Sequence, residues 1–396
     1  MHRLCGDLGL VRILFHGVAP WFPTGYGTQT AVWAKRMAQA GHEVIISAQA
    51  GSTNCSTVHW EGLPVLPSPL ENQAIPSVLQ TYMDQVQPDL TLFLHDVWNF
   101  GDAAIIFKGR NVAAWIPTDT HAARVPGRSG LAKGDIEFLE LSGVRPIAMS
   151  KHGEGVLRAA GHDPLYVPHG IDTLNAWTPL TDEERAGIRE AENIPADAFV
   201  VGVVGQNLDP RRKSWSEHML GFARFRERHP EAILAASAMV VQKGSNDLLA
   251  MARACGLEYP AIRFTDQVMQ YTGIMPQQLM RSWYGRLDVL LNCTHAEGFG
   301  LAAIEAQACG TPVINMKGHT GPELAGPGWV VDAQEFYNPT HESWWWVPSV
   351  KGITKALNEA HSVARYRRDK SRAFAEQYDI ERVWPYWEKA LAELAP

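Results

Sequence analysis

The sequence has 396 residues, of which 46% are hydrophobic and 19% are charged. This mixture is typical of folded proteins and excludes a chain that is disordered or collagen-like throughout. The length predicts two or three folded units rather than one core. Lys and Arg total 35 against 42 Asp and Glu, a formal charge of −7, so there is no basic surplus and nucleic acid is not an expected partner.

Cysteine usage and apolar runs indicate the compartment. Five cysteines are scattered without a C-x-x-C pair: Cys5, Cys55, Cys255, Cys293 and Cys309. This argues against a disulfide framework or a cysteine zinc site and favours the cytoplasm. No apolar run approaches the roughly 18 residues that cross a bilayer, so we expect neither a spanning helix nor a signal peptide. Peripheral membrane contact stays open, because composition does not reveal an amphipathic face, and so does the oligomeric state.

The first half of the chain has the pattern of a parallel α/β domain. A strand at 11–16 leads through a turn rich in Gly and Pro into a helix from Thr28, followed by a strand at 44–47. Short apolar runs, each followed by a turn or a helical pattern, predict further buried strands at 89–95, 112–116, 146–150 and 166–168.

The second half starts the same pattern again, with a strand at 199–205 and a helix at 215–228. Further strands are expected at 232–237, 261–264, 287–292, 311–315 and 328–332. The acidic segment 173–196 is the most linker-like stretch between the halves, so we place the domains at 1–173 and 174–379. The fold class is therefore α/β, with two Rossmann-like doubly wound domains facing across a cleft and ligands at the carboxyl ends of the strands.

The segment 292–314 is the most informative one for function. It is expected to form a strand, a turn with Gly298 and Gly300, a short helix starting near Phe299, and a stop before the next strand. Free backbone N–H groups at 298–301, including that of Leu301, would then point out of the positive end of a helix. Such an end stabilises a phosphate through hydrogen bonds and the helix dipole.

Two carboxylates flank this predicted anion site. Glu297 lies in the turn, and Glu305 lies on the helix, four residues after Leu301 and on the same side. Because like charges repel, carboxylates suit the hydroxyl groups at either end of a sugar diphosphate rather than its phosphates. The alternative is a capping Glu297 with a solvent-facing Glu305.

The sequence Glu297-Gly298-Phe299-Gly300-Leu301, followed by Glu305, resembles the signature of the retaining glycosyltransferases of family 4, which have GT-B architecture. The resemblance implies that Glu297 holds hydroxyls of the donor sugar and that Glu305 holds the ribose of the nucleotide. It also implies that a helix at about 380–396 crosses back to the first domain. Gly25 and Gly27 resemble the family's N-terminal glycine loop, which approaches the donor phosphates; a plain turn is the alternative.

The basic run Arg211-Arg212-Lys213 occupies the place where the family carries an Arg and a Lys that neutralise the leaving diphosphate. We select Arg212 and Lys213, with their register open. The sequence departs from the family at Gln206, where an Arg is usual. A solvated basic surface is the alternative.

Candidates from the first domain follow its predicted strands. Asp119 and His121 lie where relatives place an Asp or a His near the donor sugar, and helix capping is the alternative for Asp119. His95 and Asp96 are acceptor-side candidates or a buried polar pair. Glu323 falls where the family has a Glu on a donor-side loop.

The chain contains no Asp-x-Asp triplet, no His-Glu-x-x-His and no Walker loop. We therefore predict a metal-independent retaining glycosyltransferase without a cofactor, which uses a UDP- or GDP-sugar, an unidentified acceptor and front-face attack. An epimerase or a phosphorylase on the same fold, or a non-catalytic nucleotide-sugar binding module, are the alternatives.

Overall fold

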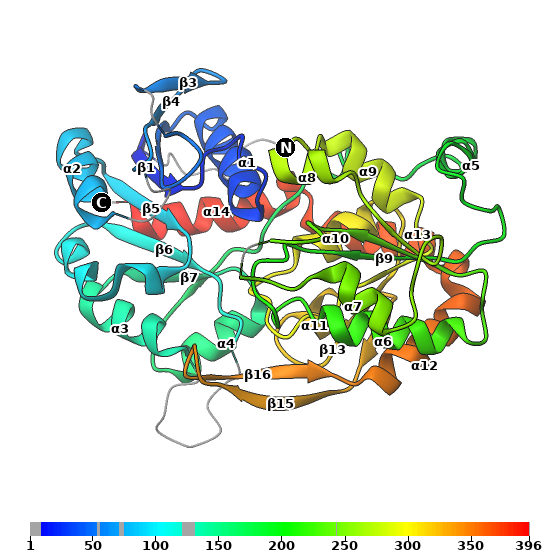
Figure 1. Cartoon of the computed structure of the whole chain (residues 1–396). Helices are drawn as coiled ribbons and strands as arrows, with labels where there is room; N and C mark the ends of the chain where they lie inside the picture. The colour runs from blue at the N-terminus through cyan, green and yellow to red at the C-terminus, as the bar shows by residue number, and fades with distance from the viewer. Residues whose placement is uncertain (1–8, 54–55, 71–74, 121–130, 243, 396) are drawn as a thin grey trace.

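The computed structural model describes residues 9–53, 56–70, 75–120, 131–242 and 244–395. In these ranges the chain forms an eight-stranded sheet, a six-stranded sheet and a two-stranded hairpin. Figure 1 shows the larger sheet in the blue-to-cyan half of the chain and the other in the green-to-yellow half. This is the expected α/β fold with two Rossmann-like domains.

The N-terminal sheet has the order β3-β4-β2-β1-β5-β6-β7-β8, and all its pairs are parallel except β3 with β4. Both faces are buried, since Ile13 and Phe15 of β1 pack in one core cluster and Leu14 packs in another. Its elements are β1 (Arg12–Gly17), α1 (Gly25–Gln39), β2 (Glu43–Ala48), β3 (Val58–Trp60), β4 (Leu63–Leu66), α2 (Pro76–Val86), β5 (Leu90–Leu94), η1 (Val97–Phe107), β6 (Val112–Ile116), α3 (Lys133–Ser142), β7 (Arg145–Ala148), α4 (Lys151–Ala159) and β8 (Leu165–Tyr166).

The second sheet has the order β11-β10-β9-β12-β13-β14, the order of a dinucleotide-binding fold, and its pairs are parallel. The elements of this half are α5 (Asp182–Ala191), β9 (Val200–Val204), α6 (Trp215–Arg226), β10 (Ile233–Ser237), α7 (Leu248–Ala254), β11 (Ile262–Phe264), α8 (Gln267–Thr272), α9 (Gln277–Gly285), β12 (Val289–Leu291), α10 (Leu301–Ala308), β13 (Val313–Met316), α11 (Gly321–Leu324), β14 (Trp329–Val331), α12 (Val350–Val363), η2 (Ala364–Arg367), α13 (Arg368–Ala375) and η3 (Glu376–Tyr378).

The last helix, α14 (Ile380–Leu394), returns to the N-terminal sheet, where it is drawn in red in Figure 1. Trp387 of α14 is fully buried, with its ring 5.8 Å from that of Trp33 on α1 and 4.9 Å from that of Trp115 on β6. Arg36 also binds Glu381 at 2.9 Å. The C-terminal helix therefore shares the core of the first domain.

Three features differ from the sequence-based expectations. Helix α1 begins at Gly25, not at Thr28, because the Oγ1 of Thr24 caps it by accepting from the Gly27 N–H at 3.1 Å. The expected linker 173–196 contains α5, which begins with a capping box made by Thr181 and Glu184. Two antiparallel pairs were not predicted, namely β3 with β4 and the hairpin of β15 (Ala333–Asn338) and β16 (Ser343–Pro348).

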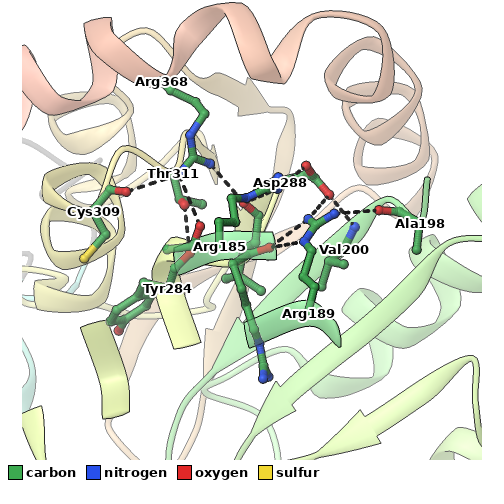
Figure 2. Close-up of polar contacts among 12 residues, drawn as sticks. Arg185, Arg189, Ala198, Val200, Tyr284, Asp288, Cys309, Thr311 and Arg368 are labelled. Carbon is green, nitrogen blue, oxygen red and sulfur yellow. Dashed lines mark hydrogen bonds and ion pairs between the residues drawn. The ribbon is translucent and has the colours of Figure 1, made fainter. Parts of the chain in front are cut away.

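A polar network fastens α5 to the second sheet (Figure 2). The carboxylate of Asp288 accepts from Arg185 Nη2 at 2.7 Å, Arg189 Nη2 at 2.8 Å and the backbone N–H of Val200 at 2.7 Å. The Arg189 side chain is 7% exposed, so its charge requires this partner. Within the described ranges, no helix is long and apolar enough to cross a membrane.

Candidate functional site

The candidate site lies where the strand order of each sheet reverses. In the second sheet this point is between β9 and β12, and the loops that follow these strands carry Lys213 and Glu297. In the first sheet it is between β1 and β5, with Asp96 after β5 and Asp119 after the neighbouring β6. Ligands of open α/β sheets bind at such switch points, at the carboxyl ends of the strands.

Glu297 is held by two cations from the loop after β9. Its Oε2 lies 2.6 Å from Lys213 Nζ, and its Oε1 lies 4.0 Å from Arg212 Nη1. Burial raises the pKa of Glu297, but the charges of Lys213 and Arg212 outweigh burial and lower it to about 2. Burial lowers the pKa of Lys213 despite the attraction of Glu297. The carboxylate is thus ionised at neutral pH, and both predicted cations contact one predicted acid.

Backbone contacts fix the positions of these loops. The N–H groups of Arg211 and Arg212 both donate to Asp209 Oδ1, at 2.7 and 2.8 Å, and the N–H of His295 donates to the Arg212 carbonyl at 2.9 Å. The stem of Lys213 packs on Gly205, where an added Cβ would lie 3.0 Å from Lys213 Cγ. Glycine at the end of β9 therefore lets this lysine reach Glu297.

The turn before α10 offers the expected backbone donors. Gly300 is the N-cap, with a φ of 109° that favours glycine. Among the described residues, none accepts a hydrogen bond from the N–H groups of Gly298, Phe299, Gly300 or Leu301. These four amides stand beside Lys213 and Glu297, which is an arrangement suited to an anion.

The two domains touch at this turn. A Cβ on Gly298 would lie 2.6 Å from Pro117 Cβ of the first domain, and one on Gly25 would lie 3.1 Å from Leu301 Cδ1. Gly298 therefore requires the absence of a side chain, because backbone of Pro117 lies as close as 2.9 Å, whereas at Gly25 the contact is only with the end of the flexible Leu301 side chain. Gly27 differs, because its Cβ would meet the Phe22 carbonyl of its own loop at 2.2 Å. The predicted glycine loop is thus the first turn of α1, in which Gly25 faces the second domain and Gly27 packs inside the first.

Glu305 lies on α10, half-buried, and accepts a hydrogen bond from the Tyr284 hydroxyl of α9 at 2.9 Å. Burial raises the pKa of Glu305 to about 7, although the Tyr284 hydrogen bond opposes the shift. Glu305 is thus half-buried and oriented by Tyr284 rather than fully solvent-facing.

Asp119 faces the cationic loop from the first domain. Burial raises its pKa to about 7; the charge of Arg212 lowers it, whereas Asp96 and Glu297 raise it. These mutual effects place Asp119, Asp96, Arg212 and Glu297 in one electrostatic cluster that spans both domains. None of the described helices begins at Asp119, and His121 lies outside the described residues.

The residues after β5 are held by a tyrosine that sequence reasoning did not select. Tyr26, which stands between Gly25 and Gly27, donates its hydroxyl proton to Asp96 Oδ1 at 2.9 Å. Its ring lies 5.0 Å from that of His95, and burial raises the Tyr26 pKa well above its usual value. Burial lowers the pKa of His95. The only sequence signal for Tyr26 was its place between two glycines.

His319 and Glu323, on the segment after β13, make two further polar contacts. His319 is buried, and its Nε2 lies 2.8 Å from the Thr294 carbonyl oxygen; burial lowers its pKa to about 4. The carboxylate of Glu323 accepts from the backbone N–H groups of Lys151 and His152, at 2.9 and 3.3 Å. Glu323 therefore caps α4 of the first domain and joins the two domains.

The second domain of the chain resembles known glycosyltransferases in sequence. Residues 198–341, which include Arg212, Lys213 and Glu297, match the family model described as "Glycosyl transferases group 1". D-inositol 3-phosphate glycosyltransferase of Xylanimonas cellulosilytica is 28% identical over 203 residues, which cover 48% of this chain and 44% of that protein. The match thus spans less than half of that relative's length.

Solved structures share the fold along nearly the whole chain. Sucrose-phosphate synthase from Thermosynechococcus elongatus superposes with a TM-score of 0.72 at 16% identity, covering 97% of this chain and 98% of that one. The chain therefore has the GT-B fold, and its residues 198–341 resemble the group 1 glycosyl transferases. Another GT-B neighbour, Anabaena Alr3699/HepE in complex with UDP-glucose, has a TM-score of 0.64 at 16% identity and covers 97% of this chain and 98% of that one.

Proposed function

We propose that the chain is a retaining glycosyltransferase that uses a UDP- or GDP-sugar as donor and does not use a metal ion in catalysis. The observation that carries this proposal is the grouping of Lys213, Arg212, Glu297 and the amides of 298–301 at the switch point of the second sheet. Residues 174–379 would bind the donor, and residues 1–173 with the terminal helix would bind the acceptor. The UDP-glucose in the Anabaena neighbour supports testing UDP first.

The wall formed by the second domain suits a diphosphate because of its charge. Lys213 and Arg212 supply two positive charges against the single negative charge of Glu297. The four amides add hydrogen-bond donors beside these cations. A diphosphate in this place would share Lys213 with Glu297, and its growing charge during bond cleavage would be stabilised by groups already fixed in position.

The carboxylates would bind the hydroxyl groups on either side of the diphosphate. Glu297 is ionised, so it accepts from hydroxyls of the donor sugar through charge-assisted hydrogen bonds. Glu305 would accept from the ribose, positioned by Tyr284. Gly25 and Gly298 lie where the two walls approach each other, and a bound donor between these walls would be shielded from water.

The transfer would follow a front-face course. The acceptor oxygen bonds to the anomeric carbon on the face that the diphosphate leaves. The electron pair of the broken C–O bond stays on the phosphate oxygen, which takes the proton of the acceptor hydroxyl. Asp119 faces Arg212 and Glu297 from the first domain and would orient the acceptor hydroxyl.

The test is a donor panel of UDP-glucose and GDP-mannose, with D-inositol 3-phosphate as the first acceptor because a relative carries that name. Free nucleotide, a new glycoside with the donor's anomeric configuration, and activity that persists in chelator are the expected results. An epimer of the donor would show an epimerase, and sugar 1-phosphate a phosphorylase. Donor binding without nucleotide release, with Glu297→Ala changing only affinity, would show a non-catalytic binding module.

A further inference from the structure

A cluster of two histidines and a glutamate lies on the second domain, outside the candidate site. His229 and Glu231 are in the turn between α6 and β10, and His361 is near the end of α12. The Nδ1 of His229 lies 3.8 Å from Glu231 Oε1, and the Nε2 of His361 lies 3.4 Å from that same oxygen. The three ligand atoms all lie within 4.8 Å of one another.

We propose that His229, Glu231 and His361 bind a divalent zinc-type ion. Two imidazoles and a carboxylate are ligands that zinc accepts, with bonds of about 2.0 to 2.1 Å. In a tetrahedral site with such bonds, neighbouring ligand atoms lie about 3.3 Å apart. The two separations that involve Glu231 are close to this value, so small side-chain movements would complete the site, and water would occupy the fourth position.

The hydrogen bond of His229 to Asn358 uses Nε2, so Nδ1, the nitrogen that faces Glu231, can bind a metal ion. Asn358 donates its amide N–H to the Thr354 carbonyl at 2.8 Å, which fixes the amide so that its oxygen faces His229 Nε2 at 3.1 Å. The proton of a neutral His229 must then be on Nε2. Its Nδ1 carries a lone pair that points at the Glu231 carboxylate, which is also an acceptor. A metal ion satisfies both, and histidine ligands of metal ions usually donate their other ring N–H to an oxygen acceptor, the role that the Asn358 amide oxygen has here.

The imidazole rings are also held in place. The His229 ring stacks on Phe225, with centroids 4.5 Å apart and an angle of 28°, and the His361 ring lies 5.1 Å from that of Phe199. The ring centroids of His229 and His361 lie 4.0 Å apart. The side chains of His229, Glu231 and His361 are 22%, 36% and 33% exposed, so an ion can reach them from solvent.

The position of this cluster separates it from the candidate site. Phe199 directly precedes β9 and Glu231 closely precedes β10, so the cluster is at the amino ends of these strands. Lys213 and Glu297 follow β9 and β12 at the opposite, carboxyl edge. The ion would therefore link the turn after α6 to α12 and stabilise the domain without contacting the donor.

The experiment measures zinc binding by the full chain after chelator treatment, using titration calorimetry with ZnCl₂. We expect one ion per chain, a rise in the urea midpoint with zinc concentration, and no binding by the His229→Gln/His361→Gln variant. Asn358→Ala should weaken binding by about 10- to 100-fold, because it removes only the group that orients His229. His59→Asn, on exposed β3, should bind as the unaltered chain does.

Unfolding curves in chelator should coincide for the unaltered chain and the double variant, which separates lost binding from lost folding. X-ray absorption of the zinc-loaded chain should show imidazole and oxygen neighbours. Absence of zinc binding, or binding that His229→Gln/His361→Gln leaves unchanged, would overturn the proposal.

Discussion

The contact between Lys213 and Glu297 provides the sharpest test of the candidate site, through a double-mutant cycle with Lys213→Met and Glu297→Gln. The side chains of this pair are only 14% and 15% exposed and lie 2.6 Å apart. Removing one partner of a buried ion pair costs about 3 to 5 kcal/mol. Arg212 stays near Glu297, so we expect Lys213→Met to lower the free energy of unfolding by about 2 to 3 kcal/mol. The double variant should lose less than the sum of the single losses.

The effect of Lys213→Met on turnover should be independent of its effect on stability. If Lys213 acts on the charge of the leaving diphosphate, Lys213→Met raises the barrier by about 2 to 4 kcal/mol, which is about 30- to 900-fold in kcat. The same factor should persist in the Glu297→Gln background, because Lys213 then acts on the substrate directly. The assays are urea unfolding followed by Trp fluorescence, and release of nucleotide from the donor.

Lys317→Met is the matched control. Lys317 Nζ also lies 2.6 Å from a carboxylate, that of Asp332, but the two side chains are 67% and 78% exposed. Water already solvates this pair, so its loss should leave unfolding unchanged. Equal destabilisation by Lys317→Met and Lys213→Met would show that burial does not strengthen the Lys213–Glu297 pair, and an unaltered kcat in Lys213→Met would exclude Lys213 from catalysis.

Four further predictions address Asp119, Glu305 and Asp288. Burial raises the pKa of Asp119 to about 7. If the ionised form orients the acceptor, kcat/KM should fall about tenfold per pH unit below that value. The role is contradicted if Asp119→Asn shows the same fall of kcat/KM at low pH. The pKa of Asp119 is higher in the folded chain than in the unfolded chain, so Asp119 should lower the free energy of unfolding as pH rises from about 4 to about 7. In Asp119→Asn the free energy of unfolding should fall less over this pH range. Glu305→Ala should raise the Kd for UDP or GDP in titration calorimetry more than it lowers kcat, and a loss confined to kcat would count against ribose binding. Asp288→Ala should lower the free energy of unfolding in urea by about 2 to 4 kcal/mol, because Arg185 and Arg189 lose their carboxylate partner. The control Asp163→Ala removes an exposed ion pair and should change this free energy little. Equal losses in the two variants would show that burial is not the cause.

Local patterns were sufficient for most of the fold. The parallel strands predicted from short apolar runs are present, because strands buried on both faces need continuous hydrophobic residues. The antiparallel pairs were missed. In β3 and β4 the pairing depends on a turn in which Glu61 and Gly62 both have positive φ, and in β15 the polar residues Gln334 and Glu335 interrupt the apolar pattern.

The repeated strand–helix pattern and the spacing of Glu297 and Glu305 could be predicted before folding was considered, because both depend on residues that are neighbours along the chain. The folded chain was needed to show which groups meet across long separations: Glu297 with Lys213, Tyr26 with Asp96, and Glu323 with the start of α4. It also brought His229 and His361 together, although 131 residues separate them along the chain. Such contacts depend on strand order and on the domain interface. Both result from the joint burial of many side chains that are distant along the chain, so no local sequence pattern predicts them.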